Sequence, residues 1–110
     1  RIVGQRAPLP LILTGEPVDA ADALRLGLVD EVVPAAECVS RAVAIAQRIA
    51  RNSPVAVAAA RDVTRAALGL PLTAGLDLER AAFLACFAAG DRVEGVRAFL
   101  EKRPPNFPGS

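Results

Sequence analysis

Prolines and glycines divide this chain into short helical pieces, and this division limits the folds it can adopt. Proline removes a backbone donor and clashes with the preceding helical turn, whereas glycine readily takes the left-handed conformation that closes a helix. Between these breaks, apolar residues recur at helical spacing. The predicted helices cover residues 1–13 (short or broken, because of Pro8 and Pro10), 20–26, 35–51, 54–68, 73–89 and 91–102.

The stretch from Leu13 to Pro34 has the pattern of a joint between two parts of a fold. Asp19 is placed to cap the second helix, and Gly27 fits the left-handed position that ends it. The valine-rich residues 28–33 then favour a short strand. A lone strand is not stable, so this segment must pair with a strand outside the chain or lie as an extended connector.

The later helices carry their own start signals. Ser53 is placed to cap the helix that Pro54 begins. Asp91 and Glu94 resemble a capping box at the start of the last helix. That helix is expected to bury Val93, Val96 and Leu100, with Phe99 beside this stripe.

Small apolar residues dominate the helices. Hydrophobic residues make up 53% of the chain but aromatic residues only 4%, and a domain of this size buries a smaller share of its surface than a large one. The alanine-rich faces at 42–50 and 55–67 therefore exceed what the helices can cover among themselves. We expect them to associate with another domain or with copies of the chain.

Composition and charge exclude several classes of protein and site. With 13 basic and 12 acidic residues, the charge gives no case for a nucleic-acid or membrane partner, and no stretch is long enough to span a bilayer. The chain has no histidine, and we expect no metal and no cofactor.

Cys38 and Cys86 are expected to be reduced, buried thiols of a cytoplasmic protein with bacterial-type composition. No signal peptide is recognisable. The first residue is not methionine, so the chain either starts within a longer protein or has lost its initiator methionine by processing.

Two motifs resemble the C-terminal part of the crotonase family of enoyl-CoA hydratases and isomerases. The first is LTG…VDAxxAxxLGLVDEVVP, from Leu13 to Pro34, and the second is DxxEG…AFLEKR, from Asp91 to Arg103. They occur in order, separated by the expected helices, and the resemblance extends from about Val3 to Phe107. The chain departs from the family at Pro8 and Pro10, where members usually have a continuous helix.

The resemblance implies a fold and a division of labour. The segment would be the mainly α C-terminal region of the α/β crotonase (ClpP-like spiral) fold, with about four to five helices and one short strand. Residues 1–34 would end the spiral core and form the joint, and residues 35–110 would form the helical region that covers the site and drives assembly into trimers or dimers of trimers. The oxyanion hole and the catalytic glutamates would precede this segment, so we expect no catalytic residue here. The clustered carboxylates of residues 16–31 have structural roles at caps and turns.

In the family, the phenylalanine and lysine of the last helix can reach the coenzyme A part of a ligand bound to the neighbouring subunit. The matching residues are Phe99 and Lys102. A ring offers an apolar or stacking face, and an ammonium is a point charge for phosphate. The alternatives are that Phe99 belongs to the core of the last helix and that Lys102 is a solvated residue at the helix end. Lys102 is the single lysine among the basic residues.

Two functions remain open from the sequence. The first is the C-terminal segment of an acyl-CoA-processing enzyme, which adds water to 2-enoyl-CoA thioesters or shifts their double bond. The second is a catalytically inactive helical oligomerisation module. The sequence leaves acyl chain length and the choice between hydratase and isomerase open.

Overall fold

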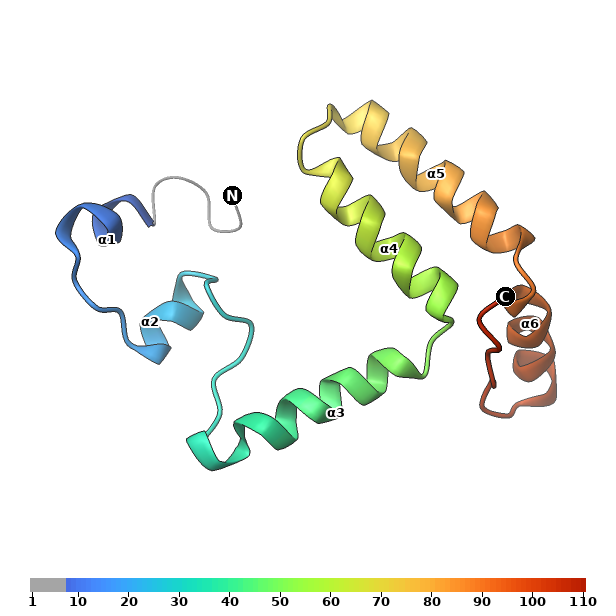
Figure 1. Ribbon diagram of the computed structural model, residues 1–110, viewed down its shortest axis with the longest axis horizontal. Helices are drawn as coiled ribbons and strands as arrows, with labels where there is room; N and C mark the ends of the chain where they lie inside the picture. Colours follow the sequence, from blue (N-terminus) through green and yellow to red (C-terminus); the bar gives the residue numbers. More distant parts are fainter. Residues whose placement is uncertain (1–7) are drawn as a thin grey trace. The chain divides into compact units, whose positions relative to one another are not determined.

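The computed structural model describes residues 8–110. They form six α-helices and one 3-10 turn, with no strand in this range. The elements are α1 (Pro8–Thr14), α2 (Ala20–Arg25), η1 (Ala35–Glu37), α3 (Cys38–Ala50), α4 (Pro54–Ala67), α5 (Leu72–Ala88) and α6 (Asp91–Glu101). The chain divides into two compact units, Arg1–Arg41 and Ala42–Ser110 (Figure 1).

In the first unit, α1 and α2 begin and end where local chemistry dictates. Prolines are tolerated at the start of α1 because the first amides of a helix lack intrahelical partners; residues 1–7 of the predicted first helix lie outside the described range. The Asp19 carboxylate accepts the Asp22 N–H at 2.7 Å, as the predicted cap requires. Gly27 has φ +73° just after α2, which confirms its predicted conformation.

The strand predicted at Leu28–Val33 is wrong for this chain. These residues form neither strand nor helix, because the described residues offer no neighbouring strand to complete a ladder. The segment is a connector, and Glu31 accepts the Arg41 Nε–H at 2.8 and 2.9 Å.

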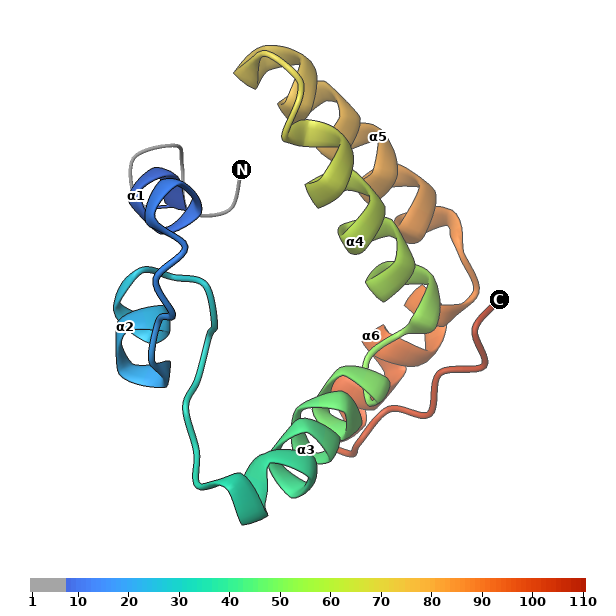
Figure 2. The same ribbon diagram turned by 60° about the vertical axis from the view of Figure 1, so that its left-hand side comes forward.

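In the second unit, α4 and α5 run side by side and are joined by the turn at residues 68–71 (Figures 1 and 2). Ser53 caps α4 as predicted, and its Oγ accepts the Ala56 N–H at 3.2 Å. Near this turn, a Cβ added at Gly75 would be in ordinary van der Waals contact with the Ala67 Cβ, 3.6 Å away, so the close pairing does not depend on the glycine. No residue within these two helices is fully buried.

The expected apolar stripe of the last helix is not buried. Val93, Val96 and Leu100 are 61%, 53% and 74% exposed, and the buried positions of α6 are Asp91 and Ala98. The helix turns its small and acidic side towards the C-terminal tail, residues 104–110, and leaves its large aliphatic side uncovered. Cys38 is also exposed, contrary to expectation, while Cys86 is half-buried and both thiols are free.

Ala98 is the one buried hydrophobic residue in the described range, at 1% exposure. Large hydrophobic side chains are exposed along every described α-helix except α4, where the valines are half-buried. This exposure agrees with the expectation of uncovered apolar faces. No described helix combines the length and apolar character that crossing a membrane requires.

Candidate functional site

The two residues that the sequence singles out lie at the end of α6. Phe99 is 83% exposed and lies in the last turn of α6, so it is not a core residue of this chain. Lys102 follows the helix directly and is also exposed. The two residues are three positions apart in sequence, and both side chains are exposed at this end of the helix.

Lys102 ends α6 in the left-handed conformation, with φ 53° and ψ 40°. Its N–H donates to the carbonyl oxygens of Ala98 and Phe99, and the Arg103 N–H donates to the Ala98 oxygen at 3.1 Å. Bonds of this pattern satisfy the last free carbonyls of a helix. They also fix the direction in which the chain leaves α6.

Arg103 binds back onto the helix. Its Nη1 and Nη2 donate to the two oxygens of Glu94 at 2.7 and 3.0 Å, and its Nε donates to Glu101 at 2.6 Å. Glu94 also accepts the Asn106 N–H at 2.7 Å. Hydrogen bonds from Arg103 and from this backbone amide lower the pKa of Glu94 to about 2, and those to Glu94 and Glu101 raise the pKa of Arg103.

A second carboxylate holds the far end of the tail. Asp91, 3% exposed, accepts the Ser53 hydroxyl at 2.5 Å and the Gly109 N–H at 2.8 Å, and its own N–H donates to the Ser110 oxygen at 3.1 Å. The hydrogen bond from the Ser53 hydroxyl is the main reason that the pKa of Asp91 is lowered. The predicted capping box is therefore wrong: Gly90 occupies the N-cap position without a side-chain bond, because both carboxylates are engaged with the tail and its neighbours.

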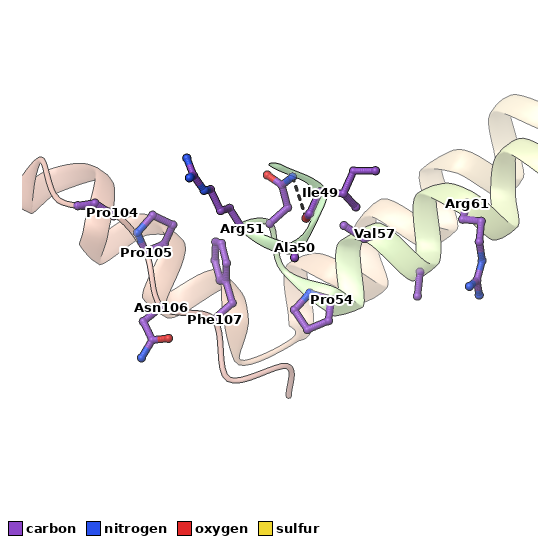
Figure 3. A pocket seen from close by; sticks show the side chains of 12 residues that line it. Ile49, Ala50, Arg51, Pro54, Val57, Arg61, Pro104, Pro105, Asn106 and Phe107 are labelled. Atoms are coloured by element: carbon purple, nitrogen blue, oxygen red, sulfur yellow. Dashed lines mark hydrogen bonds between the residues drawn. The ribbon is translucent and has the colours of Figure 1, made fainter. Parts of the chain in front are cut away.

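A cavity of about 560 Å³ lies between the tail and the α3–α4 connection. Pro54, Val57 and Phe107 contribute to its wall (Figure 3). Its charged lining residues are Arg51 and Arg61, and the Arg61 Nε donates to Asp62 at 2.9 Å. The lining contains no carboxylate, thiol or histidine, so it offers no general base or nucleophile.

The carboxylates that cluster near the joint have the structural roles expected of them where the structure shows contacts. Asp19 caps α2, and Asp22 pairs with Arg25 at 2.9 Å. Within residues 8–110, no three His, Cys, Asp or Glu residues are grouped so that they could hold a metal ion.

Sequence reasoning missed the links from Asp91 to Ser53 and from Glu94 to Arg103. One signal was available: a proline-rich tail that follows directly on a helix must turn back or leave the surface, and Arg103 stands at that turn. The partner of an arginine nine residues away in sequence is set by tertiary geometry, which spacing alone does not reveal.

Comparison with known proteins decides the family. The sequence model described as "Enoyl-CoA hydratase/isomerase" matches residues 1–110. The chain belongs to the enoyl-CoA hydratase/isomerase family.

Members of this family resemble the chain over nearly its whole length. It is 39% identical over 107 residues to the mitochondrial enoyl-CoA hydratase of Pongo abelii, covering 97% of this chain and 37% of that protein. It is 39% identical over 109 residues to the 2,3-dehydroadipyl-CoA hydratase of Escherichia coli, covering 99% of this chain and 43% of that protein.

The fold agrees with these relatives. A crystal structure of an enoyl-CoA hydratase from Bacillus anthracis matches with a TM-score of 0.96 and 36% identity, over 100% of this chain and 43% of that one. The chain is thus a mainly helical portion of the crotonase fold. It spans less than half the length of these relatives.

Proposed function

We propose that this chain is the helical segment of an enzyme acting on 2-enoyl-CoA thioesters, as hydratase or isomerase, and that Phe99 and Lys102 contact the coenzyme A part of a substrate bound to a neighbouring subunit. The observation that carries this proposal is that both residues are exposed at the end of α6, in a chain of this family. Coenzyme A enters as part of the substrate, and no separate cofactor is proposed.

The chemistry of the two side chains fits the parts of coenzyme A. The Lys102 ammonium is a compact cation that suits a phosphate, and the Phe99 ring offers an apolar face to the rest of the molecule. Neither side chain touches the reacting carbons in this proposal. The oxyanion hole and the acid–base glutamates belong to parts of the enzyme outside these 110 residues.

Uncovered apolar faces support assembly into a trimer or a dimer of trimers. In this arrangement, α6 of one subunit would lie over the substrate of the next, so the contact requires the oligomer. The division at residue 34 between spiral core and helical region, and the cytoplasmic location, stay predictions.

The test is Lys102→Ala in the natural gene product that contains this chain. An exposed charge-assisted contact contributes on the order of 1 kcal/mol and weakens with salt. We expect the KM for a 2-enoyl-CoA to rise about fivefold at low salt, with kcat nearly unchanged because the contact is the same in the ground and transition states.

Two controls isolate the phosphate. Arg97→Gln removes another exposed cation of α6, which pairs with Glu101 at 2.9 Å, and should leave the KM unchanged. A pantetheine thioester lacks the nucleotide phosphates and should bind Lys102→Ala and the parent protein equally. If Lys102→Ala weakens both esters alike, the phosphate contact is wrong.

The alternative is a catalytically inactive oligomerisation module, favoured by the absence of any paired acid and base in the cavity described above. It predicts that the natural gene product assembles but does not turn over 2-enoyl-CoA esters. Turnover by that product excludes it.

A further inference from the structure

The backbone at Lys102 is unusual within residues 8–110. Lys102 is the one residue other than glycine with a positive φ there. The chain places glycine at the equivalent positions after α1 and α2, with φ 70° at Gly15 and 73° at Gly27. Glycine is favoured at such helix ends because a Cβ is strained in the left-handed region, so the lysine after α6 points to a role for its side chain.

Arg103 holds this conformation from the next position. Its backbone N–H closes the helix end on Ala98, and its guanidinium binds both oxygens of Glu94, nine residues earlier. Release of these bonds would free Lys102 to take the ordinary helical conformation. The Cα–Cβ bond would then point in a different direction, because φ and ψ set that direction.

The Arg103 guanidinium is not itself a free phosphate ligand. Its nitrogens donate to Glu94 and Glu101 at 2.6 to 3.0 Å, and Nη1 also reaches the Pro104 oxygen at 3.2 Å. Two carboxylates neutralise its charge, and the bidentate geometry fixes the plane of the group.

We infer that Arg103, clamped by Glu94, is a positioning residue that keeps Lys102 in the left-handed conformation and so aims its ammonium at a phosphate of coenzyme A. This inference rests on the proposed function. It assigns the Glu94–Arg103 pair a role in substrate affinity although neither residue touches the substrate.

The test is a double-mutant cycle in the natural gene product, with Arg103→Gln, Lys102→Ala and the double variant. Arg103→Gln should raise the KM for a 2-enoyl-CoA about threefold, somewhat less than Lys102→Ala, with little change in kcat. In the Lys102→Ala background, Arg103→Gln should not raise the KM further, because the ammonium that Arg103 positions is already absent. Glu94→Gln should behave as Arg103→Gln does.

Kinetics with the pantetheine thioester distinguish a folding defect from a misdirected Lys102 side chain. Structural damage raises the KM for the pantetheine thioester as well, whereas a misdirected ammonium affects the CoA ester alone. Arg97→Gln serves as the matched variant, since it removes an arginine–glutamate pair from the same helix and leaves the Glu94–Arg103 bonds in place.

Several outcomes overturn the inference. If Arg103→Gln leaves the KM unchanged, or raises it by the same factor with and without Lys102, Arg103 does not act through Lys102. Weakening of both esters also refutes it. If Lys102→Ala itself has no effect on the KM, the proposed contact of Lys102 with coenzyme A fails first, and the positioning role fails with it.

Discussion

Replacement of Lys102 by glycine should weaken substrate binding and yet make the protein more stable. The left-handed conformation at φ 53° costs a residue with a Cβ about 1–2 kcal/mol, and glycine removes that cost. Glycine also raises the conformational entropy of the unfolded chain, which lowers the free energy of unfolding by about 0.4–1 kcal/mol. The relief of strain is the larger effect, so we expect a net gain of roughly 0.5–1 kcal/mol.

Lys102→Ala is the matched variant for this prediction. Alanine also lacks the ammonium but keeps the Cβ and therefore the strain. In the natural gene product, a thermal scan should place the unfolding midpoint of Lys102→Gly about 1–4 °C above that of Lys102→Ala, while the two variants share the same raised KM for the CoA ester. The reasoning is refuted if the glycine variant unfolds at or below the temperature of the alanine variant.

Three further predictions concern the clamp and the helix faces. The pKa of Glu94 is about 2 in the folded protein against an ordinary 4.5. Its stabilising contribution is therefore present above pH 4.5 and is lost as the pH falls towards 2. Glu94→Gln should reduce the fall in unfolding temperature over this range, and an unchanged pH profile would contradict the pairing. The 110 residues alone should not hydrate crotonyl-CoA in an absorbance assay, because the proposed oxyanion hole and acid–base glutamates lie outside them; turnover above the blank would contradict this. Sedimentation at micromolar concentration should show association, since side chains such as Val39 and Leu72 are 76% and 79% exposed; a stable monomer would count against it.

The sequence predicted the helices well because their limits depend on local chemistry. Asp19, Gly27 and Ser53 act within a few residues of their own positions, and the structure confirms each of them. Exposure of the apolar faces followed from a surplus of small and aliphatic residues over what a short chain can bury.

The features that sequence reasoning missed depend on contacts between distant residues. Periodicity assigned an inner face to Val93, Val96 and Leu100, but it cannot tell which face a neighbour covers; here the tail covers the opposite side, where a Cβ on Gly95 would lie 3.5 Å from the Phe107 ring. The strand at 28–33 failed because extended residues need a partner that the described chain does not supply. The left-handed Lys102 could not be read from the sequence, since lysine rarely adopts that conformation.

A crystal structure of the natural gene product with a bound CoA thioester tests the central claim most directly. The account predicts that the Lys102 Nζ of one subunit lies within about 3 Å of a phosphate oxygen of the coenzyme A held by its neighbour, with the Phe99 ring against the same ligand and Lys102 still left-handed. A Lys102 ammonium directed into solvent, with the phosphates held by other residues, would contradict it.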